Sequence, residues 1–397
     1  MLMQLFFKRL FGQLPSTSRY EKRVKKMQKK VKLLQEIEQS DYFKEYQELR
    51  SKVNEDKFLQ KKEEYTSRKY KDTEYYQKLA ELKKLSGDRN VKKYLKATSD
   101  AERLQLAGNI AVKGYLRLKE ETETPEFKEK NAFWADKKRW QHSERGQIEA
   151  RYLELHNSEN IRFYLKADKR SLEYFESWQP IWNAPFREPS LEKNDFKAGF
   201  WFKQPELKRD FSYCEEAQAY MGDRNVNIQN SIMSIVTKKE HVTAPAWHEK
   251  KGFTMHDFDY TSAVVNTGGT FGMAVGRFLA KVRATGKCHS AIYLVGENRF
   301  PLIEMYHYNG KHIVVGITDK NGKEEQVLRG IRPNEWYVMS VAVNRQEIIW
   351  KINDFEVFRC INPMPGQNLY ITCQSFAPKD QAGEGQLDIA WIRAFER

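Results

Sequence analysis

The segment RFPLIEMYHYNG, residues 299–310, holds side chains that could carry chemistry. Glu304 offers a carboxylate and His307 an imidazole, and both types of group can transfer protons near neutral pH. The apolar and aromatic residues around them predict a β-strand, in which alternate side chains share a face. A single bulge re-aims the residues that follow it, so it can bring His307 onto the face of Glu304.

The elements that must position this segment are short strands. From residue 196 onward the chain consists of brief alternating runs rich in β-branched and aromatic residues, including SAIYLVG, HIVVGITD, EWYVMSVAVN, EIIWKIND and LDIAWIRAF. Gly, Asn and Pro separate them, and DKNG at 319–322 is typical of a hairpin turn. The pattern predicts an all-β antiparallel sandwich over residues 196–397.

The first part of the chain predicts helices instead. A heptad seam runs through Tyr20, Val24, Met27, Val31 and Leu34, which favours a coiled coil or a helical hairpin. Hydroxyl residues stand three positions before an aromatic at four places, where each would cap a helix: Ser40, Thr73, Thr124 and Ser171. The similar segments 91–100 and 161–170 suggest a helical repeat of about 35 residues. The predicted fold class is therefore α+β with several domains: a basic all-α region at 1–178, a Pro-containing linker at 179–195 and the β domain at 196–397.

Charge separates these two parts. The chain carries 68 Lys and Arg against 54 Asp and Glu, and almost all of the +14 excess lies in residues 1–180. We expect the helices to bind a protein partner or to self-associate. Residues 1–32 could also contact a membrane surface peripherally, because an apolar N-terminus precedes the basic run EKRVKKMQKKVK.

The expected subcellular location follows from the signal-peptide features that the N-terminus lacks. Lys8 and Arg9 interrupt its apolar stretch, and it has neither a leading positive charge nor a small-residue cleavage site. No run approaches the ~18 apolar residues of a membrane span. The cysteines form no C-x-x-C pair. We expect a cytoplasmic protein with reduced thiols, without a signal peptide or transmembrane helix, and membrane-associated only through residues 1–32.

The order of the β segments resembles a known family. YTSAVVNTGGTFGMAVGRFLAKVRA, SAIYLVGENRFPLIEMYHYNG, NEWYVMSVAVNRQEIIWKINDFEV and LDIAWIRAFER follow one another as do the strands of glycoside hydrolase family 16, the laminarinase, lichenase and agarase group of retaining β-glycanases. The resemblance implies a concanavalin-like β-jelly roll over roughly residues 196–397. The helical part has no counterpart in it.

The resemblance also shows what the catalytic strand lacks. The family strand reads Glu, apolar, Asp, apolar, apolar, Glu, and it lies on Leu302, Glu304 and His307 here. Retaining hydrolysis needs two carboxyl groups about 5–5.5 Å apart, one of which attacks the anomeric carbon. Leu302 occupies the position of that attacking group and cannot form a glycosyl ester.

Ligand-binding candidates follow from the same alignment. The family's two sugar-stacking tryptophans correspond to His289 and Tyr293, and Trp247, Tyr306 and Tyr308 are further candidates for a concave surface. The resemblance gives Asp388 a role in a structural calcium site of some relatives. No other cofactor is expected.

These observations favour a non-catalytic interaction or scaffold protein: a degenerate hydrolase-like jelly roll that recognises glycan or protein, joined to a basic partner-binding module. One alternative is a divergent endo-β-glycanase that uses Glu304, assisted by His307. A second is a nucleic-acid-associated structural protein. Nucleic acid fits less well, because acidic residues are interspersed after Gln35 and the standard binding motifs are absent.

Overall fold

The computed structural model describes residues 14–168, 179–201, 211–248 and 250–396. The chain divides into two compact units, a β unit formed by residues 1–31 and 169–397 and a helical unit formed by residues 32–168. Along the sequence, the segment that forms the helical unit thus lies between the two segments that form the β unit. The sequence-based boundary at residue 178 is wrong in this respect, because the first part of the first described helix packs on the β unit.

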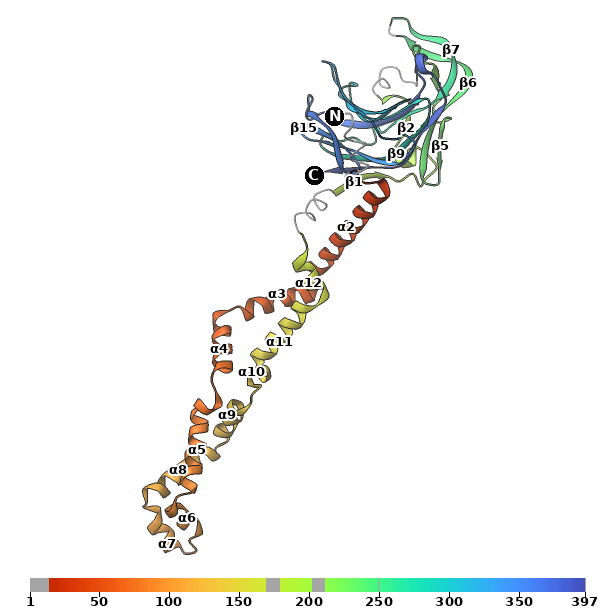
Figure 1. The fold of residues 1–397 in the computed structure, drawn as a ribbon. Helices are drawn as coiled ribbons and strands as arrows, with labels where there is room; N and C mark the ends of the chain where they lie inside the picture. The colour runs from red at the N-terminus through yellow and green to blue at the C-terminus, as the bar shows by residue number, and fades with distance from the viewer. Residues whose placement is uncertain (1–13, 169–178, 202–210, 249, 397) are drawn as a thin grey trace. The chain divides into compact units, whose positions relative to one another are not determined.

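The helical unit is built from short helices that follow one another closely (Figure 1). Helix α2 contributes its first part to the β unit and its last part to the helical unit. The α-helices described are α2 (Thr17–Glu38), α3 (Asp41–Val53), α4 (Asp56–Ser67), α5 (Glu74–Ser86), α6 (Arg89–Lys96), α7 (Asp100–Ala107), α8 (Ile110–Glu123), α9 (Pro125–Ala135), α10 (Arg139–His142), α11 (Glu144–Asn157) and α12 (Glu159–Lys166).

Side-chain caps set where these helices begin. Ser40, Thr73 and Thr124 accept hydrogen bonds from the backbone N–H groups three residues on, at 3.3, 3.4 and 3.3 Å. Such caps satisfy amide groups that have no partner inside the helix. These three predicted starts are confirmed, and Ser171 lies outside the described residues.

The helical unit runs out and back as a helical hairpin. Helix α3 packs on α11, α4 on α10, and α5 on both α8 and α9. Tyr46 and His156 link α3 to α11 by a hydrogen bond of 3.2 Å, beside a bidentate Arg151–Glu45 ion pair. The 35-residue repeat and the coiled coil stay predictions. No helix in the described part of the chain is long and apolar enough to span a bilayer.

The β unit is a two-sheet sandwich of the jelly-roll class. The larger sheet has the order β16-β15-β14-β9-β18-β6-β7-β4, with β1, β3 and β5 paired at its side, and the smaller has the order β13-β12-β11-β10-β17-β8-β2. The strands are β1 (Gln179–Ala184), β2 (Lys197–Ala198), β3 (Ser212–Tyr213), β4 (Gln218–Tyr220), β5 (Val226–Gln229), β6 (Ile232–His248), β7 (Gly252–Ser262), β8 (Val264–Asn266), β9 (Gly276–Gly286), β10 (His289–Gly296), β11 (Leu302–Asn309), β12 (Ile313–Thr318), β13 (Lys323–Leu328), β14 (Tyr337–Val343), β15 (Glu347–Ile352), β16 (Phe355–Ile361), β17 (Leu369–Phe376) and β18 (Gly385–Glu396).

The segment predicted to be a linker belongs to this sandwich. Strand β1 pairs antiparallel with β18. Phe186 and Phe196, which follow it, are buried in the main core together with Trp350 and Phe278. The prolines that suggested a linker are compatible with this arrangement, because an edge strand can dispense with some backbone N–H groups.

Helix α2 is held on the outer face of the larger sheet at its N-terminal end. Tyr20 is buried against Leu279 of β9 and Val338 of β14. Glu21 pairs with Lys281 at 2.8 Å. Asn353, in the β15–β16 turn, donates to the Pro15 carbonyl at 2.9 Å and accepts from the Val338 amide at 3.0 Å. The heptad seam therefore begins as a contact with the sheet.

Replacement of Tyr20 by alanine tests this attachment. Loss of a buried aromatic ring leaves a cavity between helix and sheet, and we expect the free energy of unfolding of the β unit to fall by about 2–4 kcal/mol. Urea unfolding monitored by hydrogen exchange on β-unit peptides measures it. Lys22→Ala, an exposed neighbour on the same helix, is the control and should change stability by less than about 0.5 kcal/mol. Equal effects of the two changes would show that the helix is not held through Tyr20.

Candidate functional site

Strand β11 places the predicted chemistry on the outer face of the smaller sheet. Its register with β10 pairs Tyr293 with Glu304 and Ile292 with Tyr306, so a bulge falls at Met305. The bulge turns His307 to the side of Glu304, and the His307 Nδ1 and Glu304 Oε1 atoms lie 3.1 Å apart. Leu302 is also on this face, packed beside Tyr293 and Tyr370.

The same bulge sends two predicted ligand-binding residues to the other side. Tyr306 is fully buried and Tyr308 nearly so, and both belong to the core between the two sheets. The prediction that they contribute to a concave surface is wrong. A plain alternation of side chains cannot locate a bulge, and one extra residue reverses the face of everything that follows it.

Glu304 is a buried carboxylate with two cationic or polar partners. It is 4% exposed. Its Oε1 lies 3.1 Å from His307 Nδ1 and 3.3 Å from the Lys323 ammonium nitrogen. Lys323 opens β13, directly after the predicted turn at 319–322. At Gly316 of β12, between these strands, an added Cβ would lie 2.4 Å from the Glu324 carbonyl oxygen. The glycine therefore lets β13 approach β12 closely.

These partners decide the charge of Glu304. Burial by itself would raise the pKa of this carboxyl, but the His307 hydrogen bond, the charge of His307 and the charge of Lys323 outweigh it, so the pKa is lowered. Glu304 is consequently ionised at neutral pH. Its Oε2 is also buried and has no hydrogen-bond partner among the described residues.

The rings of His307 and His289 lie next to Glu304 on this face, one after the other. His307 Nε2 lies 3.4 Å from His289 Nδ1, and the ring of Phe376 packs against His289 with centroids 5.0 Å apart. Burial, followed by the charge of His307, lowers the pKa of His289 to about 4. His289 is therefore neutral at physiological pH. The alignment-derived candidates His289, Tyr293 and His307 are thus brought together on one face.

An aromatic cover packs on this face. Its buried residues are Phe200, Phe211, Tyr220 and Val264. The partly buried residues packed against them are Tyr213, Trp247, Phe253 and Phe376. Trp247, the remaining ligand-binding candidate, packs edge-on against Phe253 within it. Tyr293 is only 7% exposed. Tyr293 therefore offers little free surface to a sugar, whereas Trp247 is half-buried.

A second acid lies near Tyr293 and was not identified from the sequence. Glu216 precedes β4 and accepts a hydrogen bond from Gln218 Nε2 at 2.6 Å. Burial raises the pKa of this carboxyl to about 7, against the opposing hydrogen bonds of Tyr220 and Gln218. Burial, then the charge of Glu304 and, less strongly, that of Glu216 raise the pKa of the Tyr293 hydroxyl. No hydrogen bond joins the two carboxylates in the described residues.

Asp388 has a different role from the one its alignment suggests. It is 1% exposed, and its oxygens accept from Ser234 at 2.6 Å, Gln386 at 3.0 Å and Arg283 at 2.7 Å. A calcium ion at this carboxylate would have to displace the arginine. The calcium site is therefore not supported, and the described residues contain no cluster of three His, Cys, Asp or Glu ligands. The four cysteines are unpaired.

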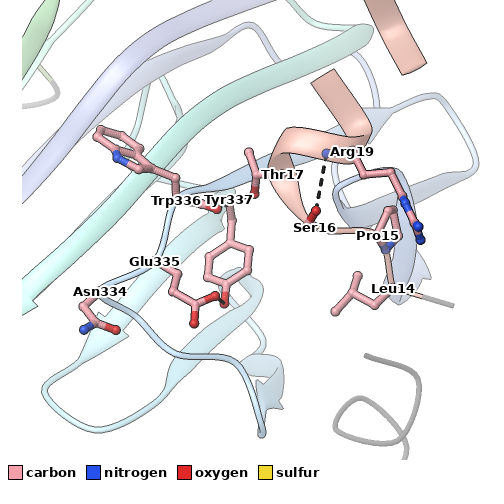
Figure 2. Close-up of a pocket in the computed structure, with 9 residues that line it drawn as sticks. All are labelled: Leu14, Pro15, Ser16, Thr17, Arg19, Asn334, Glu335, Trp336 and Tyr337. Carbon is pink, nitrogen blue, oxygen red and sulfur yellow. Dashed lines mark hydrogen bonds between the residues drawn. The ribbon is translucent and has the colours of Figure 1, made fainter. Parts of the chain in front are cut away.

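The larger sheet carries a pocket of its own (Figure 2). Its volume is about 550 Å³ and it lies between the start of α2 and the loop before β14. The Tyr337 hydroxyl donates to Glu335 there at 3.2 Å. Its lining residues are Leu14, Pro15, Ser16, Thr17, Arg19, Asn334, Glu335, Trp336 and Tyr337. None of them is a residue that the sequence singled out for chemistry.

The two-sheet sandwich defines the class of the β unit, a jelly roll. Solved structures that are similar to this part of the chain include several glucanases. The laminarinase catalytic domains of Thermotoga petrophila and Thermotoga maritima share 15% and 16% identity, cover 55% and 56% of this chain and 98% and 99% of their own, each with a TM-score of 0.45. The endo-β-1,3-glucanase of Pyrococcus furiosus shares 14% identity over 55% of this chain and 94% of its own, with a TM-score of 0.44. No family model and no curated protein matches the chain.

Lys323 and Glu216 are the charged groups that sequence reasoning missed. Lys323 follows a recognised hairpin turn, so its closeness to β12 was foreseeable, but its reach to Glu304 depends on the order of three strands. Glu216 lies in CEEAQAY, where no periodic signal distinguishes it from Glu215. Only tertiary contacts leave Glu216 half-buried and Glu215 exposed.

The Glu216 carboxyl predicts a pH dependence. Its pKa in the folded protein, about 7, exceeds the ordinary value of 4.5 for a glutamate carboxyl. The stability it contributes is therefore fully present below about pH 4.5 and is lost as the pH rises through 7. Relative to Glu216→Gln, we expect the wild type to lose on the order of 2 kcal/mol between pH 5 and 8.

Urea unfolding at several pH values, read by hydrogen exchange on β-unit peptides, measures this difference. The adjacent exposed variant Glu215→Gln should retain the wild-type decline. A Glu216→Gln profile parallel to wild type would show that the carboxyl is not desolvated in the folded protein.

Proposed function

We propose that this chain is a non-hydrolytic interaction protein. In this proposal the β unit presents a recognition surface for glycan or protein, and the helical unit binds a partner protein. The observation that carries it is the identity of residue 302 in β11. Leu302 shares a face with Glu304 and His307, and it packs among apolar side chains.

The state of Glu304 supports the same proposal. A nucleophile must be free to reach an anomeric carbon, and a general acid must be protonated. Glu304 is buried, ionised and held by His307 and Lys323. Those contacts suit a structural charge cluster, which fixes the relative positions of β11 and β13.

Hydrolysis assays test the proposal. We expect purified full-length protein to release no reducing ends from laminarin, lichenan, agarose or carrageenan above the blank, and Glu304→Gln to behave identically. A characterised laminarinase assayed in parallel confirms that the substrates are competent. Release by the wild type that disappears in Glu304→Gln would overturn the proposal.

Recognition is tested by direct binding. A glycan array with the full chain, and pull-downs of interacting proteins, identify the ligand class. His289→Ala and Trp247→Ala should weaken glycan binding if the outer face of the smaller sheet is the recognition surface. The full chain is needed, because a cut near residue 178 would separate α2 from the sheet on which it packs.

A divergent hydrolase is a second candidate, and one observation favours it. Glu216 and Glu304 have pKa values shifted in opposite directions, and both act on Tyr293. Paired carboxyl groups with separated pKa values are typical of an acid and base that work together. In this case Glu216 would be the acid and Glu304 the base or nucleophile. Hydrolysis abolished by Glu216→Gln as well as by Glu304→Gln would identify this pair.

A further inference from the structure

The first part of α2 has one face that is fully engaged. Tyr20 and Val24 pack on β9, β14 and β18 of the larger sheet. Arg23 pairs with Asp354 at 2.7 Å, and Glu21 with Lys281. These contacts fix the rotation of the helix about its own axis.

The opposite face of the same turns is cationic. Lys22, Lys25, Lys26 and Lys29 are all exposed. Lys25 and Lys26 each lie three or four residues from both Lys22 and Lys29, so the four form one continuous stripe along the helix. We call these four residues the lysine stripe. After Glu21 the next acidic residue in the sequence is Glu36.

The acids of the neighbouring sheet are already neutralised by other cations. Asp354 pairs with Arg23, and also with Arg277 at 3.5 Å and Lys351 at 3.7 Å. Asp388 pairs with Arg283. Within the described part of the chain, no ion pair involves a member of the lysine stripe. Among the described residues the stripe is therefore a concentrated positive surface without a paired acid.

We propose that the lysine stripe binds an anionic lipid surface. Lysines close to an anionic bilayer each strengthen binding by roughly fivefold, and several on one helix face act together. The contact with the sheet leaves the stripe facing outward, so the chain can bind a surface without unfolding or losing its core.

The sequence next to the helix favours lipid over nucleic acid. The residues before α2 include Leu2, Leu5, Phe6, Phe7 and Phe11 beside Lys8 and Arg9. Stable binding to a bilayer generally needs an apolar contribution in addition to a basic patch. Phosphate binding to nucleic acid draws on the cations alone.

Vesicle sedimentation with the full chain tests this proposal. The variants are K22E/K25E/K26E/K29E and a matched control with the same charge change on the helical unit, K57E/K71E/K92E/K113E, whose lysines are also exposed. We expect the wild type to bind phosphatidylcholine vesicles containing phosphatidylglycerol far better than pure phosphatidylcholine. The stripe variant should lose on the order of 100-fold in partition coefficient, and the control less than about fivefold.

Several results would overturn the proposal. One is the absence of binding to anionic vesicles, and another is an equal loss in both variants, which would indicate net charge instead of the stripe. Stronger, stripe-dependent binding to duplex DNA with weak vesicle binding would assign the surface to nucleic acid. The four Lys→Gln changes at the stripe repeat the test with less charge reversal, and thermal unfolding equal to wild type shows that each variant is folded.

Discussion

A carboxylate withdrawn from water must be compensated, and the outer face of the smaller sheet is organised around that requirement. An uncompensated buried charge costs several kcal/mol. Glu304 meets this cost with the Lys323 ammonium, which comes from β13 beyond β12, and with the His307 ring, which follows the bulge in β11. The strand order, the glycine at 316 and the bulge at Met305 therefore together bring Lys323 and His307 to Glu304.

That cluster changes what the face can do. A glycanase needs two carboxyl groups that a substrate can reach. Here Leu302 and Tyr293 are packed with Tyr370, and an aromatic cover occupies the adjoining surface. Apolar contacts therefore surround Leu302 and Tyr293 on this face. Among the acids of the described residues, Glu216 is the one whose pKa is raised, to about 7.

Helix α2 links the sequence's charge asymmetry to the architecture. Its apolar residues pack in two places: Tyr20 and Val24 lie against the larger sheet, and Leu33 and Ile37 pack within the helical unit. Because one face of α2 packs on the larger sheet, the exposed lysines lie on the opposite face. The positive excess of the first part of the chain is thus displayed along a defined stripe, at least over the turns that lie on the β unit.

The sequence by itself determined the features that depend on local periodicity. Alternation predicted the strands, hydroxyl residues predicted three helix starts in the described residues, and the spacing of Leu302, Glu304 and His307 located the strand that carries the Glu304–His307 pair. These signals are short-range, since a cap or an alternating pattern involves residues within a few positions of one another. Only the tertiary structure decided that Lys323 reaches Glu304 and that Glu216 is half-buried while Glu215 is exposed. It also decided that Tyr306 and Tyr308 face the core and that residues 179–184 form a strand. Each of these depends on which distant segments become neighbours, and a one-residue bulge or a strand pairing leaves no periodic trace in the chain.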